Sequence, residues 1–70
     1  MKSVTGRDFA RIVERHGWIL LRISGSNHIY GKDGSLVRLS IPIHGNKPLK
    51  CGLLKHLTKI AELSDEVLER

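Results

Sequence analysis

The hydrophobic positions near the start of the chain recur at helical spacing. One face of a predicted helix would hold Phe9, Ile12, Val13 and His16, while the charged residues Arg7, Arg11, Glu14 and Arg15 lie off that face. Thr5, followed three residues later by Asp8, is typical of a helix start, because its side-chain oxygen can accept a hydrogen bond from a free backbone N–H. Gly17 stands where helices commonly end.

Between residues 18 and 41 the spacing changes to that of β-strands. The pattern predicts strands over 18–24, 28–32 and 36–41. Gly25-Ser26-Asn27 forms the first predicted turn and Asp33-Gly34 the second, and Pro42 ends the third strand. Residues 43–49 are then a loop.

A second helix is predicted to begin near Pro48 to Lys50, since proline suits the first helical turn. Its apolar stripe consists of Leu53, Leu54, Leu57, Ile60 and Ala61. Ser64, with Asp65 and Glu66 behind it, resembles the start of a short terminal helix. The sequence therefore predicts one α+β domain over residues 1–70, in which two helices cover one face of a three-stranded antiparallel sheet in the order α-β-β-β-α.

Strand alternation assigns the side chains to the two faces of this sheet, provided that no bulge shifts the pairing. The helix-facing set would be Ile19, Leu21, Ile23, Ile29, Val37, Leu39 and Ile41. The open face would then carry Arg22, His28, Tyr30, Arg38 and Ser40. Such a face, with a histidine, a tyrosine and two arginines at close quarters, would suit a phosphate-bearing ligand.

The charge of the chain changes the picture of its partners. The 70 residues carry a net charge of +5, and the last ten hold four of the seven acidic residues, so the body of the domain is strongly basic. A basic body favours a polyanion such as nucleic acid, although a solubilising surface explains it equally well. The single cysteine, Cys51, excludes a disulfide within these residues and fits a reducing cytoplasm. No apolar run approaches the ~20 residues of a membrane span.

His28 is the candidate for chemistry. Histidine side chains exchange protons near neutral pH, and RNA cleavage needs mainly a base, an acid and positive charge, because the 2′-hydroxyl is an internal nucleophile. The N–H groups of the preceding Gly25-Ser26-Asn27 turn could hold a phosphate oxygen. Arg22, Arg38 and Lys50 are candidates for binding the RNA backbone. His44, Tyr30 or water could be the second proton-transfer group, and a solvated surface histidine is the alternative reading of His28.

The other polar residues predict no further site. The four histidines and Cys51 show no close-paired metal-ligand spacing, so we expect no metal site and no cofactor.

Several short motifs, in order along nearly the whole chain, resemble the HicA family, the small toxins of HicA–HicB toxin–antitoxin pairs. They are Gly17-Trp18, Leu21-Arg22, Gly25-Ser26-Asn27-His28-Ile29-Tyr30, Asp33-Gly34, Ile41-Pro42-Ile43-His44 and Leu49-Lys50-Cys51-Gly52-Leu53-Leu54.

The resemblance implies a fold like that of double-stranded-RNA-binding domains and a metal-independent endonuclease that cleaves mRNA and arrests translation and growth. It also implies a HicB-type antitoxin that covers the active face. The family's essential histidine follows the Gly-Ser turn. Many relatives carry Gly-Ser-His-His there, whereas this chain has Asn27 in the first histidine position, so the catalytic role falls on His28.

Two other functions fit the same residues. A non-catalytic RNA-binding module would use the basic face for phosphates, with His28 as a contact only. An interaction protein would instead dock that basic surface on an acidic protein. Cleavage products under metal-free conditions would separate the first from the nuclease, and a lack of RNA affinity would favour the second.

Overall fold

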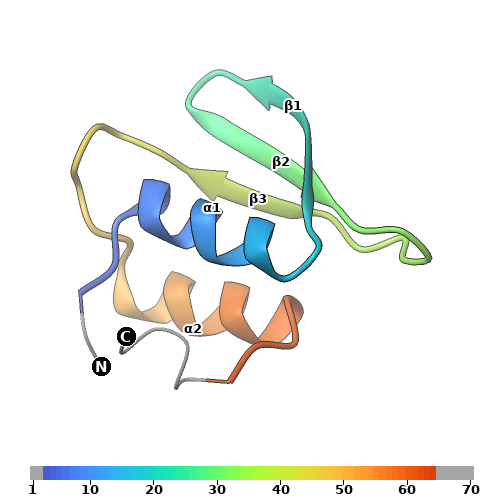
Figure 1. The fold of residues 1–70 in the computed structure, drawn as a ribbon. Coiled ribbons are helices and arrows are strands. Elements are labelled where there is room, and N and C mark those ends of the chain that lie inside the picture. The colour runs from blue at the N-terminus through green and yellow to red at the C-terminus, as the bar shows by residue number, and fades with distance from the viewer. Residues whose placement is uncertain (1–2, 65–70) are drawn as a thin grey trace.

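Two helices lie on one face of a three-stranded antiparallel sheet in the computed structural model, which describes residues 3–64 (Figure 1). The elements are α1 (Gly6–Arg15), β1 (Ile19–Ser24), β2 (Asn27–Gly31), β3 (Leu39–Pro42) and α2 (Cys51–Ile60). The predicted α+β fold in the order α-β-β-β-α is confirmed. The short helix predicted from Ser64 onward lies outside the described residues, apart from Ser64 itself.

The ends of α1 follow the predicted signals. Thr5 Oγ1 accepts a hydrogen bond from the backbone N–H of Asp8 at 3.1 Å, which satisfies one of the free donors of the first turn. Gly17 follows the helix with φ +92°, a conformation that costs glycine little. His16, expected on the apolar face, is instead the exposed residue that ends α1, and its Nδ1 lies 2.9 Å from the carbonyl oxygen of Ile12.

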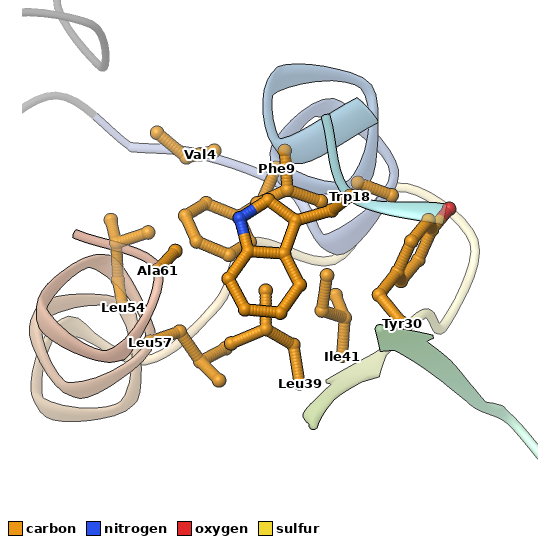
Figure 2. Close-up of a cluster of buried hydrophobic side chains, with 11 residues drawn as sticks. Val4, Phe9, Trp18, Tyr30, Leu39, Ile41, Leu54, Leu57 and Ala61 are labelled. Atoms are coloured by element: carbon orange, nitrogen blue, oxygen red, sulfur yellow. The ribbon is translucent and has the colours of Figure 1, made fainter. Parts of the chain in front are cut away.

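The core lies between the helices and β3 (Figure 2). Its buried hydrophobic residues are Val4, Phe9, Ala10, Val13, Trp18, Tyr30, Leu39, Ile41, Leu54, Leu57 and Ala61. In the predicted stripe of α2, Leu54, Leu57 and Ala61 are buried, while Leu53 and Ile60 are half-buried. Both helices pack on β3, so the helix layer is centred on that side of the sheet.

The strands are ordered β1-β2-β3, and a β-bulge in β1 overturns the predicted alternation there. Leu20 pairs with Tyr30 and Arg22 pairs with Ile29, which leaves Leu21 as the extra residue. Paired residues of an antiparallel sheet point to the same face. Leu20 and Ile23 therefore face the helix side, whereas Ile19 and Leu21, expected to face the helices, lie on the open face with Arg22.

The assignment of faces on β2 was also wrong. Tyr30 is only 2% exposed and belongs to the core, and His28 pairs with the buried Ile41, so both side chains lie on the helix side. Ile29 takes the open face, opposite Ser40. The reason is that a tyrosine buries more apolar area than an isoleucine, provided that its hydroxyl finds a partner, which it does on α1.

The third strand is shorter than predicted, because the residues before Leu39 are hydrogen-bonded among themselves. Ser35 Oγ accepts from the N–H of Val37 at 3.1 Å, and Arg38 Nη1 donates to the carbonyl oxygens of Ser35 and Val37. Val37, expected to face the helices, is 42% exposed, and Leu36 is 95% exposed. Leu39 and Ile41 face the helices, as predicted.

The chain before α1 and the loop before α2 lie against each other. The N–H of Leu49 donates to the carbonyl oxygen of Val4 at 2.7 Å, and Thr5 forms an isolated bridge with Pro48. These contacts place the first turns of both helices near the end of β3, as Figure 1 shows on the side where each helix begins. At that end, Gly6 packs so closely that an added Cβ would overlap the carbonyl oxygen of Pro42.

Candidate active site

A cleft opens beside α1 because the helix layer does not extend over the whole sheet. Both helices pack on β3, and all six residues of β1 are exposed. The helix-side face of β1 and the start of β2 are thus left partly uncovered. The edge of α1 forms one wall of the resulting cleft, and the sheet forms its floor.

The cleft has a volume of about 350 Å³ and draws its lining from four parts of the chain. It is lined by Arg7, Ala10, Arg11 and Glu14 of α1, Leu20 of β1, His28 and Tyr30 of β2, and Ile43. Arg7, Arg11 and Glu14 stand at helical spacing on one side of α1, flanking the face that carries Phe9 and Val13. The same helix therefore supplies both the core and the charged wall.

His28 lies half-buried in this cleft. The expectation that it stands on the open face is wrong, but the ring is not sealed under the helices either, since the cleft opens to solvent and holds two exposed arginines. A histidine among arginines in a partly enclosed space can exchange a proton with a bound anion that the arginines hold.

Tyr30 links the floor of the cleft to its wall. Its hydroxyl donates a hydrogen bond to Glu14 Oε2 at 2.7 Å. Figure 2 shows that hydroxyl at the margin of the core, while the ring packs inside. Burial raises the pKa of Tyr30 well above its usual value, and the hydrogen bond to Glu14 and the negative charge of that carboxylate act in the same direction. Tyr30 therefore stays protonated at neutral pH and serves as a donor that fixes Glu14.

Replacing Tyr30 with phenylalanine tests this link. The ring still fills the core, but Glu14 loses its donor, so we expect the free energy of unfolding to fall by about 1 kcal/mol. The loss stays this small because water can solvate the exposed carboxylate. Chemical denaturation of both proteins measures the change. In the double-mutant cycle with Glu14→Gln, the effects of the two substitutions should not add. Full additivity would contradict the coupling.

The turn before His28 is a two-residue hairpin loop, because Ser24 pairs with Asn27 across Gly25 and Ser26. Gly25 has φ +61°, and Ser26 is not among the described residues with positive φ, which is the pattern of a type II′ turn. The carbonyl oxygen of Ser26 accepts a hydrogen bond from the N–H of Ile43 at 2.9 Å. The turn is thereby tied to a residue of the cleft, although Gly25, Ser26 and Asn27 are exposed and do not line it.

The cations predicted for RNA binding lie elsewhere. Arg22 pairs with Ile29 on the open face, and Arg38 lies on that same face over Gly31, so the sheet separates both from His28. Lys50 precedes α2 and lines a different hollow of about 420 Å³, together with His44 and Lys47.

The sequence singled out His28 as a candidate but did not point to Arg7, Arg11 and Glu14, which line the same cleft. The available signal was their i, i+4 and i+7 spacing beside the apolar face of the first helix.

Within residues 3–64, no helix has the length and apolar character that crossing a bilayer requires. In the same range, no three side chains of the metal-binding types come together as a group that could hold an ion.

The family of the chain follows from its similarity to known proteins. A comparison with curated proteins gives no match. Residues 6–63 match the family described as the HicA toxin of bacterial toxin–antitoxin systems, and this range covers each helix and strand of the described residues as well as the cleft. The chain therefore belongs to the HicA toxin family.

Proposed function

We propose that the chain is an endoribonuclease toxin that cleaves mRNA through His28 and so inhibits translation and growth. The observation that carries the proposal is the half-buried position of His28 in a cleft that it shares with Arg7 and Arg11. Membership of a toxin family supports a growth-inhibiting role. The cleft adds the charge and the proton-transfer group that RNA cleavage needs.

The reaction would be an internal transesterification. The 2′-oxygen of a ribose attacks the adjacent phosphorus, an O2′–P bond forms, and the bond from phosphorus to the 5′-oxygen of the next nucleotide breaks. The proton of the 2′-hydroxyl passes to a base, and a proton from an acid reaches the leaving 5′-oxygen. The nucleophile belongs to the substrate, so the proposed reaction does not need a metal ion to generate one.

His28 would perform one of these proton transfers. Tyr30 is unsuited to the role of base, since its raised pKa keeps the phenol protonated. Glu14 is the remaining titratable group of the cleft, and Tyr30 holds one of its oxygens at 2.7 Å, so Glu14 is our candidate for the second transfer. Arg7 and Arg11 would stabilise the negative charge that builds up on the phosphate oxygens.

The remaining RNA contacts would come from the exposed hairpin turn Gly25-Ser26-Asn27, which adjoins His28 in sequence, and from Lys50 at the start of α2. A phosphate held in the cleft lies across the sheet from Arg22 and Arg38. The proposal therefore moves the main phosphate contacts from those two residues to α1. The implied partners are mRNA and a HicB-type antitoxin, and the implied compartment is the cytoplasm.

The proposal is tested by incubating the purified chain with mRNA in the presence of EDTA. We expect discrete cleavage products on a denaturing gel and their absence with the His28 variant treated in the Discussion. RNA retained in a binding assay without any product would instead support a non-catalytic RNA-binding module.

The double substitution of Arg7 and Arg11 by alanine tests the phosphate contacts. If each arginine neutralises one phosphate of single-stranded RNA, log affinity should depend less steeply on log salt, by about 0.7 for each arginine removed. Titrations of a fluorescent RNA oligonucleotide at several salt concentrations measure this slope. Arg15→Ala changes an exposed arginine of the same helix outside the cleft and should leave the slope within one such step of the wild type. An unchanged slope in the double variant would exclude Arg7 and Arg11 from the phosphate contacts.

A further inference from the structure

The sheet has one open edge and one blunt edge. β3, at one edge, has only four residues and ends at Pro42, and both helices pack on it. β1, at the other edge, has six residues and contains no proline, and each of the six is exposed. An exposed strand of this length presents a row of free N–H and C=O groups that can pair with a strand from another chain.

Most side chains of β1 are hydrophobic and exposed. Four large hydrophobic residues are exposed on this one strand, namely Ile19 at 53%, Leu20 at 40%, Leu21 at 51% and Ile23 at 57%. Ile19 and Leu21 line a small hollow on the open face of about 130 Å³, which Gly31, Lys32, Asp33 and Arg38 complete. An exposed apolar strand is typical of a protein-binding surface.

The charges around this strand indicate the chemistry of its partner. Arg22 lies on the open face within β1, and the Arg38 guanidinium lies beside Leu21 over Gly31. Asp33 contributes the one carboxylate that lines the neighbouring hollow. A second copy of the chain would bring a further net charge of +5 and, by pairing along β1, would add a second Arg22 to the same edge. An acidic partner with an edge strand of its own would complement both features, because its strand would cover β1 and its carboxylates would face the arginines.

We propose that β1 is the docking edge for the antitoxin, an acidic protein whose own edge strand extends the sheet beside β1 and whose carboxylates face Arg22 and Arg38. The inference rests on the part of the proposed function that gives the chain an antitoxin, and not on RNA cleavage. Because Leu20 of β1 also lines the cleft, the added strand would border the cleft that holds His28.

The test uses the full chain and the protein encoded beside its gene, purified separately and titrated by calorimetry. Arg22→Glu reverses a charge at the docking edge, and Ile19→Glu places a charge on its apolar face. We expect each to weaken binding by about 10-fold or more, the usual size of a lost interfacial charge pair or buried apolar contact. Thermal unfolding of each variant alone verifies that it is folded.

Matched controls are available in the same chain. Lys55→Glu, on an exposed position of α2, changes the net charge as much as Arg22→Glu does, and Leu36→Glu alters an apolar residue that is 95% exposed outside β1. Both should bind like the wild type. Equal losses in the controls and in the β1 variants would show a general charge effect and overturn the assignment of β1.

The other outcomes are also decisive. Binding that survives both β1 variants overturns the docking edge while leaving the antitoxin in place. If the wild-type chain forms dimers, and Ile19→Glu breaks them without changing the binding of the adjacent-gene protein, β1 is the contact with a second copy. No binding by the wild type overturns this inference together with the proposed partner. Neither β1 variant alters a residue of the proposed active site. A wild-type chain that binds the adjacent-gene protein but does not cleave RNA would contradict the proposed function alone.

Discussion

The His28→Ala variant should lose growth inhibition on induction and should cleave mRNA about 10²- to 10⁴-fold more slowly than the wild type, the usual contribution of a positioned proton-transfer group. The substitution removes the imidazole from a cleft that retains Arg7, Arg11 and Glu14, so RNA binding should fall far less than cleavage. Growth curves and the rate of product formation with a defined mRNA measure the two effects. The ratio between them separates chemistry from binding.

A matched control is His56→Ala, which removes an exposed imidazole from α2. It should be as toxic as the wild type. Because the His28 side chain is only half-buried, the variant should remain folded, and its thermal unfolding checks this. A well-folded His28→Ala protein that cleaves RNA at the wild-type rate would exclude the imidazole from the mechanism.

The second large effect concerns the stability of the domain and begins at Gly6. An alanine in a helix is normally more stable than a glycine by about 0.5–1 kcal/mol. At Gly6 the added methyl would overlap the backbone oxygen of Pro42, and no side-chain rotation can relieve this clash. We therefore expect Gly6→Ala to lower the free energy of unfolding by about 1–3 kcal/mol. That is a large share of the roughly 4–10 kcal/mol available to a domain of this size.

Gly52→Ala provides the opposite case. Gly52 also lies in the first turn of a helix, but a Cβ built there meets nothing within 4 Å, so its substitution should stabilise the domain by about 0.5 kcal/mol or more. Urea denaturation of both variants gives the two signs. A Gly6→Ala protein as stable as the wild type would show that α1 can move away from Pro42 freely. Such a shift would carry Arg7 with it, so RNA affinity should be measured on the same protein.

The order of elements followed from local signals that tertiary contacts do not override. Thr5 and Gly17 bracket α1 through backbone hydrogen bonding and a positive φ, both of which are properties of the neighbouring residues alone. The stripe of α2 likewise follows from spacing. The start of the third strand was less predictable, because Arg38 donates to the carbonyl oxygens of Ser35 and Val37, and these hydrogen bonds replace strand pairing before Leu39.

The faces of the sheet were not predictable from alternation alone. A single extra residue in β1, between Leu20 and Arg22, breaks the alternation, and nothing in the local sequence marks it. Arg22 and Ile23 therefore lie on the predicted faces, whereas Ile19 and Leu21 do not. On β2 the decision rested on a distant residue, since Tyr30 can be buried only because Glu14 accepts its hydroxyl. The alternation of residues along a strand contains no information about Glu14, which lies sixteen residues away in the chain.

In the candidate site, too, one part was predictable from local sequence and the other depends on tertiary structure. The Gly-Ser turn marked His28 within the sequence, and the structure places that residue in a cleft. Its charged neighbours come from α1, and their approach depends on how far the helix layer extends over the sheet, which is a tertiary property. Arg22 and Arg38 were predicted beside His28 because alternation placed all three residues on the open face, whereas His28 lies on the helix side.

The position of Trp18 has a practical consequence for all of these measurements. It is the only tryptophan of the chain, it is 5% exposed, and it packs in the core rather than in the cleft. Its fluorescence should shift to longer wavelength when the domain unfolds and stay nearly constant when RNA enters the cleft. The natural chain thus carries its own optical reporter of folding, with no label to disturb either the cleft or the edge of β1.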